Sequence, residues 1–211
     1  MKFITSLVVL NSCATEYLMI FLHGLNSNGY EVSKKFCDLA NQYKNIKMVF
    51  PTSEKRKVGI YNNECVNAWY NITTKNVSMD EDCQGLNESM ESILDLINYY
   101  GFRPESVIIG GFSQGAAMAL YTAMNSYYSF RVVLCFSGYL PCFLSTKNCV
   151  EQRIVMTHGK KDSEVPYIFG WLSYGALLVF KQCVKFISFD GPHEFPPNYE
   201  DLVLGKYRML K

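Results

Sequence analysis

The fold expected for this chain depends first on the stretch GGFSQGAAMALYTA, residues 110–123. The apolar, β-branched residues 106–110 predict a strand that runs into it, and the alanine-rich residues after Gln114 favour a helix. Ser113, with a glycine two residues away on each side, would then occupy the corner between them. Glycines at such a corner keep side chains away from a strained backbone and leave the serine hydroxyl exposed. Without a corner, the same residues would be a small-residue helix start with no chemistry.

Short apolar segments alternate with helical ones along the rest of the chain. Further strands are predicted at 17–24, 47–51 (closed by its proline), 131–138, 153–159 and 184–189. Helices are predicted at 31–43, 80–100, 168–180 and 198–210, with Gly101 as the stop of the second. This alternation is typical of an α/β fold whose mainly parallel sheet is covered by helices on both faces. With neither a linker nor a repeat, residues 1–211 are expected to form a single domain.

The N-terminal residues 1–10 predict a strand rather than a signal peptide, because a second apolar segment follows them directly. A turn at 11–15 would join this strand to the segment 17–24 as an antiparallel hairpin. No apolar stretch is long enough to span a bilayer.

Composition narrows the function classes. The chain has 211 residues and a net charge of +1, so no nucleic-acid partner is expected, and the basic run 54–57 is interpreted as a solvated loop. The eight cysteines contain no C-x-x-C pair, and the three histidines lack ligand spacing. We therefore expect buried free cysteines, no metal, no cofactor and a reducing, cytoplasmic location.

A nucleophilic serine needs a base, and the base needs a carboxylate to orient it. In a parallel sheet these groups gather beyond the carboxyl ends of the strands. Asp162 follows the strand predicted at 153–159, and His193 lies in the glycine- and proline-rich loop after the last strand. The order Ser113, Asp162, His193 predicts nucleophile, acid and base.

Other residues compete for these roles. Asp190 and Glu194 are alternative acids, although they lie too close to His193 in sequence to orient it easily. His23 and His158, each before a glycine at a strand end, are interpreted as structural. Trp69 is either buried packing or a substrate contact.

Two features would complete the site. The tetrahedral oxyanion needs backbone N–H donors, for which Gln114 at the helix start and Leu25 after an early strand are the candidates. The long polar loop 51–80 and the segment 141–148 are expected to line a substrate groove, because loops of this length are usually functional.

The sequence resembles the acyl-protein thioesterase (lysophospholipase/carboxylesterase-like) family of α/β-hydrolases. The resembling segments are FLHGL (21–25), NAWYNI (67–72), IIGGFSQGAAMALYTA (108–123), FSGYLP (136–141), HGKKDSEVP (158–166) and GPHEFPP (191–197). The resemblance implies the α/β-hydrolase fold, the Ser113, Asp162 and His193 triad, and oxyanion donors at Leu25 and Gln114. Three departures put substrate preference in doubt: Asn71 replaces an aspartate, Ala116 replaces a glycine, and LNSNG (25–29) replaces a glycine-rich turn.

The implied function is a serine hydrolase that cleaves acyl thioesters or esters, with depalmitoylation of S-acylated proteins as the leading hypothesis. Lysophospholipase and short-chain carboxylesterase activity are the alternatives within this class. An inactive hydrolase fold used as a binding module, or an acyltransferase, would be a different class. The expected partners are an acylated protein or lipid ester, with transient membrane contact at an exposed groove mouth. The expected state is a monomer or weak homodimer.

Overall fold

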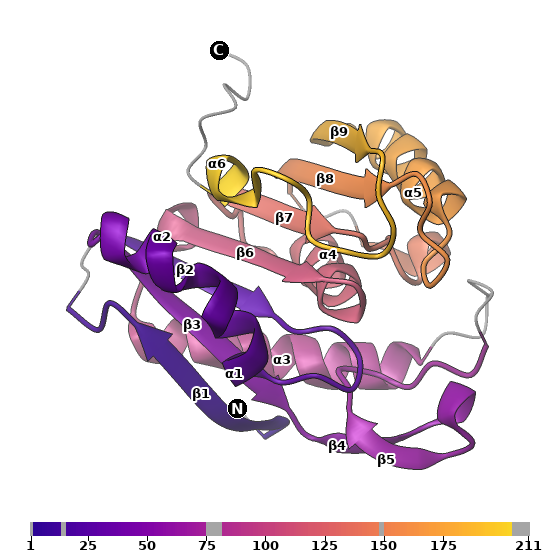
Figure 1. Cartoon of the computed structure of the whole chain (residues 1–211), viewed down its shortest axis with the longest axis horizontal. Helices are drawn as coiled ribbons and strands as arrows, with labels where there is room; N and C mark the ends of the chain where they lie inside the picture. Colours follow the sequence, from indigo (N-terminus) through magenta and orange to yellow (C-terminus); the bar gives the residue numbers. More distant parts are fainter. Residues whose placement is uncertain (1, 14–15, 75–81, 148–149, 204–211) are drawn as a thin grey trace.

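The computed structural model describes residues 2–13, 16–74, 82–147 and 150–203. A twisted seven-stranded sheet runs through the molecule in the order β1-β3-β2-β6-β7-β8-β9 (Figure 1). Its strands are β1 (Ile4–Leu10), β2 (Tyr17–Leu22), β3 (Ile46–Ser53), β6 (Val107–Phe112), β7 (Val132–Phe136), β8 (Arg153–Gly159) and β9 (Cys183–Phe189). Every neighbouring pair is parallel except β1 with β3. The predicted mainly parallel α/β sheet is confirmed.

Helices cover both faces of this sheet (Figure 1). Those on one face are α3 (Cys83–Tyr100), α4 (Gln114–Asn125) and α5 (Tyr167–Val179), and those on the other are α1 (Gly29–Ser33), α2 (Cys37–Gln42) and α6 (Tyr199–Val203). Alternate residues of β2 therefore belong to different cores: Leu18, Ile20 and Leu22 to the first, Met19 and Phe21 to the second. Burial on both faces explains why the sequence shows continuous apolar strands.

The antiparallel N-terminal strand is present, but its partner differs from the predicted one. β1 pairs with β3, with Val8 opposite Phe50, and not with β2. β2 already has β3 on one side and β6 on the other, so the free edge of β3 is the place left for β1. The predicted hairpin is therefore wrong, and residues 14–15 of its turn lie outside the described residues.

Two other elements differ in their bounds. The predicted helix 31–43 is broken into α1, a 3₁₀ turn at Lys34–Phe36 and α2, although Val32, Phe36 and Leu39 are buried as its periodicity predicts. β3 does not end at Pro51 but continues to Ser53. β2 leaves β3 after Val49, so Pro51 has a strand partner only in β1, a position where proline is tolerated. The helix stop at Gly101 is confirmed, with φ at +70°.

The region 51–80 is not a simple loop. It contains a two-stranded antiparallel sheet of β4 (Lys55–Val58) and β5 (Glu64–Asn67), joined by a 3₁₀ turn at Gly59–Tyr61. We call residues 55–73 the arm. The basic run 54–57 lies largely in β4 and is not a loop; Lys55 and Lys57 are exposed as predicted, but the side chain of Arg56 is only 12% exposed. Residues 75–81 lie outside the described residues.

Candidate active site

Ser113 forms the corner between β6 and α4. Its φ of 56° and ψ of −123° are unusual for a residue with a side chain. Its N–H donates to the carbonyl of Phe136 at 2.9 Å, and its own carbonyl accepts from the N–H groups of Ala116 and Ala117 at 3.0 and 3.1 Å. The predicted strand-to-helix corner is confirmed, and β7 and the first turn of α4 hold it on both sides.

The two glycines of the G-x-S-x-G pattern are required by close contact. A Cβ on Gly111 would lie 2.3 Å from the carbonyl carbon of Gly115, and a Cβ on Gly115 would lie 2.3 Å from the carbonyl oxygen of Leu22. These glycines let the start of α4 approach β6 and β2 closely. Ala116 lies against Gly138, where a Cβ would come within 2.6 Å of the Ala116 methyl group.

Asp162 and His193 come together as the order of the strands predicts. Asp162 follows β8, His193 follows β9, and the His193 Nδ1 lies 2.7 Å from Asp162 Oδ2. Because a carboxylate only accepts hydrogen bonds, Nδ1 carries the proton and Nε2 is left as the basic nitrogen. Asp190, one alternative acid, is instead exposed and paired with Lys161.

A second histidine holds Asp162 from the other side. His158 is fully buried, and its Nε2 lies 2.8 Å from the carbonyl oxygen of Val165 and 3.4 Å from Asp162 Oδ2. Asp162 Oδ1 accepts the N–H groups of Glu164 and Val165. Burial alone would raise the pKa of Asp162, but the hydrogen bonds from His158, His193 and the Val165 backbone outweigh it and hold the pKa well below its ordinary value. Asp162 is therefore ionised in the folded protein near neutral pH.

His23 is also buried and structural, as predicted, and it fixes the loop after β2. Its Nε2 accepts the N–H of Ser53 at 3.0 Å, so its proton is on Nδ1, which donates to the carbonyl of Gly24 at 2.7 Å. Burial lowers the pKa of His23 to about 4, against the opposing effect of the Gly24 hydrogen bond. The peptide between Gly24 and Leu25 is thus held by its oxygen, and its N–H points the opposite way because a trans peptide is planar.

A cavity of about 610 Å³ opens beside Ser113 and His193. Its apolar lining comes from Leu25, Val32, Ile60, Tyr61, Tyr70, Ile72, Phe112, Tyr139, Val165, Phe169 and Phe195. Gly24 and Gln114 also line it. The candidate nucleophile, base and both candidate oxyanion donors therefore share one apolar cavity, although residues 141–147, expected to line it, do not.

Trp69 does not contact this cavity, so the substrate contact expected for it is corrected. Its side chain is fully buried, and its Nε1 donates to the carbonyl of His23 at 2.9 Å. The rings of Trp69 and His23 also pack 5.0 Å apart. Trp69 supports the loop after β2, while its neighbours Tyr70 and Asn71 reach the cavity.

The side chain of Gln114 has a role that the sequence did not indicate. Its Oε1 accepts the N–H of Trp69 at 3.1 Å, and its Nε2 donates to the carbonyl of Tyr70 at 2.8 Å. The residue next to Ser113 thereby fixes the segment that forms one wall of the cavity. The sequence did not indicate these hydrogen bonds, because Trp69 and Tyr70 each lie more than forty residues before Gln114.

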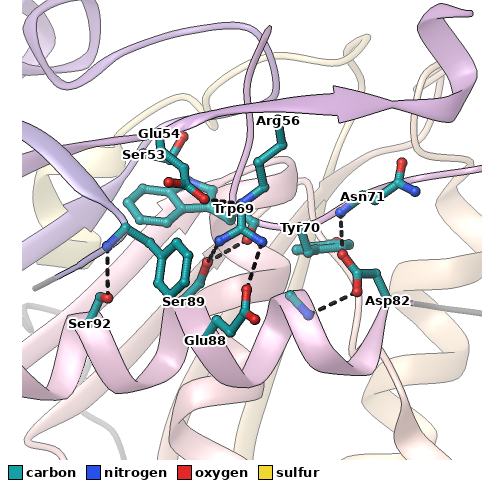
Figure 2. Close-up of polar contacts among 12 residues, drawn as sticks. Ser53, Glu54, Arg56, Trp69, Tyr70, Asn71, Asp82, Glu88, Ser89 and Ser92 are labelled. Carbon is teal, nitrogen blue, oxygen red and sulfur yellow. Dashed lines mark hydrogen bonds and ion pairs between the residues drawn. The ribbon is translucent and has the colours of Figure 1, made fainter. Parts of the chain in front are cut away.

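Figure 2 shows how the arm is tied to α3. Arg56 forms ion pairs with Glu54 (3.3 Å) and Glu88 (3.5 Å) and donates to Ser89 (3.4 Å). Ser89 in turn donates to the carbonyl of Trp69.

The N-terminal cap of the same helix holds the end of the arm (Figure 2). The N–H of Asn71 donates to Asp82 Oδ2 at 2.9 Å, and Asp82 Oδ1 caps α3 through the N–H of Gly85 at 2.8 Å. The Asn71 side chain accepts the N–H of Gly59 at 2.9 Å. The Asn71 amide therefore closes the arm.

Within the described ranges, no group of three His, Cys, Asp or Glu side chains could hold a metal ion. No helix in that part of the chain is long and apolar enough to cross a membrane. The seven cysteines that the structure describes are free thiols. Of these only Cys135 is buried, whereas Cys13, Cys37 and Cys65 are exposed, so the expectation of buried cysteines is wrong for those three.

Comparison with known proteins agrees with this geometry. A family model described as phospholipase/carboxylesterase matches residues 5–199. Acyl-protein thioesterase 1 homolog 2 of Dictyostelium discoideum is 32% identical over 169 residues, 76% of each chain. Homolog 1 from the same organism is 31% identical over 197 residues, 88% of this chain and 86% of its own. The crystal structure of Zea mays acyl-protein thioesterase 2 superimposes with a TM-score of 0.79 at 26% identity, covering 94% of this chain and 95% of its own.

Proposed function

The chain belongs to the phospholipase/carboxylesterase family of α/β-hydrolases, and from this premise we propose that it is a serine hydrolase of acyl thioesters and esters. The observation that carries the proposal is the cavity that Ser113 and His193 share, with His193 held by Asp162 at 2.7 Å. The acyl-protein thioesterase names of the relatives support acylated substrates.

The proposed reaction has two halves. His193 Nε2 takes the proton of the Ser113 hydroxyl as its oxygen attacks the acyl carbonyl, and the protonated imidazole is stabilised by the ionised Asp162. Collapse of the tetrahedral intermediate breaks the C–S or C–O bond, and the thiol or alcohol leaves with that proton. Water then attacks the acyl-enzyme with the same base, releasing the carboxylic acid and restoring Ser113.

Backbone N–H groups of Leu25 and Gln114 are the proposed oxyanion donors. Gln114 is the first residue of α4, where N–H groups have no intrahelical acceptor. The Gly24 carbonyl is held by His23, which directs the Leu25 N–H away from that histidine. Donors fixed in advance lower the barrier most, because they need no reorganisation during the reaction.

The substrate is proposed to carry a long acyl chain, with a palmitoylated protein as the first choice. The cavity volume of about 610 Å³ is within the range of small-molecule sites, and its lining is mainly aliphatic and aromatic. A lysophospholipid carries the same kind of chain and is the second candidate. We propose a cytoplasmic location, which the free cysteines support, and a monomer or weak homodimer, which light scattering would test.

The test compares a palmitoyl thioester with a short-chain ester, using wild type and Ser113→Ala. We expect wild type to prefer the thioester and the variant to lose both activities. A fluorophosphonate should label wild type at Ser113, as read by peptide mass spectrometry. Cleavage of the short ester alone would indicate a general carboxylesterase. Activity retained in Ser113→Ala would mean another nucleophile, and failure to label would favour a binding module.

A further inference from the structure

Helix α5 carries large apolar side chains on its solvent face as well as against the core. The exposed positions recur at helical spacing and form one stripe, here called the α5 stripe: Ile168, Trp171, Leu172, Gly175, Leu178 and Val179. Trp171 is 53% exposed, Leu172 54% and Val179 79%. The buried positions of the same helix are Gly170, Ser173 and Leu177, and Phe169 and Tyr174 also pack against the core. The helix is therefore apolar on its solvent face as well as on its inner face.

The inner contacts of α5 fix this orientation. Ser173 Oγ accepts the N–H of Leu140 at 2.8 Å and donates to the carbonyl of Phe169 at 2.7 Å. A Cβ on Gly170 would lie 2.3 Å from the His158 ring, so no larger residue fits at that position. Turning the helix to bury the α5 stripe would break these hydrogen bonds and bring a larger residue against the His158 ring. The exposure of the stripe is therefore a property of the fold.

The α5 stripe also lacks the charges that a solvated helix face usually carries. No residue of Tyr167–Val179 is charged. On α3, by contrast, every exposed position except Tyr99 is polar or charged: Gln84, Asn87, Glu91, Asp95 and Asn98. The first charged residue after α5 is the exposed Lys181. The aliphatic side chains and the tryptophan of this stripe are the residue types found on the lipid-facing side of an interfacial helix, and a lysine follows them at the end of the helix.

We propose that the α5 stripe docks this protein on the surface of a lipid bilayer. A 13-residue helix is about 20 Å long and about 10 Å wide, so its face covers about 200 Å². Stable protein interfaces bury about 800 Å² on each partner, which is more than this helix face offers to a second copy. A bilayer requires no matching shape, and a helix face inserted about 5–10 Å deep gains from every apolar side chain it carries. Trp171 lies in mid-stripe, suited to the headgroup boundary.

The start of α5 lies next to the cavity. Val165, just before α5, and Phe169, within it, both line the cavity wall. Figure 1 shows α5 alongside β8 and β9, near the ends toward which those strands point. Docking through α5 would bring the cavity close to acyl groups held in the membrane. This consequence rests on the proposed hydrolase function, whereas the docking itself does not.

Vesicle binding tests the proposal. Flotation with phosphatidylcholine vesicles is compared for wild type, Leu172→Gln/Val179→Gln and the control Tyr99→Gln/Tyr127→Gln, whose tyrosines are 69% and 81% exposed elsewhere. All three carry the same net charge. We expect wild type and the control to float with the vesicles and the α5 variant to bind at least tenfold more weakly. The emission of Trp171 should shift to the blue on binding, whereas Trp69 is already buried.

Three results would overturn the proposal: no vesicle binding by wild type, equal binding by the α5 variant, or equal losses in the α5 and control variants. A dimer of wild type that the α5 variant loses, without vesicle binding, would assign the stripe to a second copy instead. The far-UV circular dichroism spectra and urea midpoints of all three proteins should coincide, which shows that they are folded. Because binding is measured without substrate, a failure of the hydrolase proposal would not affect this result.

Discussion

At the scale of single residues, Ser113 combines strain with chemistry. A residue with a side chain at its φ of 56° and ψ of −123° costs on the order of 1–3 kcal/mol, which glycine largely avoids. The hydrogen bonds of its backbone to Phe136 and to the first turn of α4 maintain this conformation. The strained backbone at this residue therefore places the Ser113 hydroxyl beside the cavity.

We accordingly predict that Ser113→Gly is more stable than Ser113→Ala by about 1 kcal/mol, although both are inactive. Alanine keeps the strain of a Cβ and glycine removes it. Urea unfolding followed by circular dichroism gives the two free energies of unfolding. If the alanine variant were equally stable or more stable, the conformation would not be strained for this backbone.

A second residue-scale prediction concerns Asp162. Asp162→Asn keeps the size of the side chain and an oxygen for the N–H groups of Glu164 and Val165, but loses the charge that stabilises protonated His193. We expect kcat to fall by about 10³- to 10⁴-fold with little change in KM. The matched control is Asp190→Asn, which should retain activity because Asp190 pairs with Lys161 at the surface. The reverse result would transfer the role of the acid to Asp190.

At the scale of elements, the arm depends on its attachment to α3. We predict that Arg56→Gln lowers the free energy of unfolding by about 1–3 kcal/mol, because Glu54 and Glu88 lose their partner. It should also raise KM for a long-chain substrate more than for a short ester, since Ile60 and Ile72 of the arm line the cavity.

The control for this prediction is Lys57→Gln, one residue along β4. Lys57 is exposed, so its substitution should change neither stability nor KM measurably. Chemical denaturation and steady-state kinetics on substrates of two chain lengths give both quantities. Equal effects of the two substitutions would show that the charge of β4 matters and the attachment to α3 does not.

The elements that the sequence predicts well are those buried on both faces. The segments that became β2, β6, β7 and β8 are continuous apolar runs, which in a chain of alternating helices indicate parallel strands. The sequence predicts less well which strands pair with one another. The pattern of residues 4–10 indicates a strand but not its neighbour, and the short, polar β4 and β5 give no apolar signal at all.

In the candidate site, too, some residues could be predicted from the sequence and others could not. Ser113, Asp162 and His193 could be brought together from the sequence because the carboxyl ends of parallel strands meet at one edge of a sheet. Trp69 and the side chain of Gln114 could not be interpreted in this way. Both act through contacts between distant segments, and an isolated tryptophan in a polar stretch gives no information on whether it faces a cavity or the core.

At the scale of the whole molecule, the buried His23 links stability to pH. The unfolded chain binds a proton at this histidine below about pH 6.5, whereas the folded chain does so only below about pH 4. Between these values the unfolded state holds more protons, so the free energy of unfolding falls as the pH falls. The pKa of Asp162 is lowered from an ordinary value of 3.8, so its contribution is lost only below about pH 4. The two effects occupy separate pH windows.

We therefore predict that wild type loses about 3 kcal/mol of stability through His23 between pH 7 and pH 4, because folding lowers the pKa of this histidine from 6.5 to about 4 and each pH unit between them corresponds to about 1.36 kcal/mol. His23→Gln cannot titrate and should lose that much less over the same range, even if it is less stable at pH 7. His158 and His193 are present in both proteins, so their contributions cancel in the difference. Urea unfolding at intervals of half a pH unit measures it. Parallel curves for the two proteins would mean that protonation of His23 does not destabilise the fold. The loop after β2 would then not depend on a neutral imidazole.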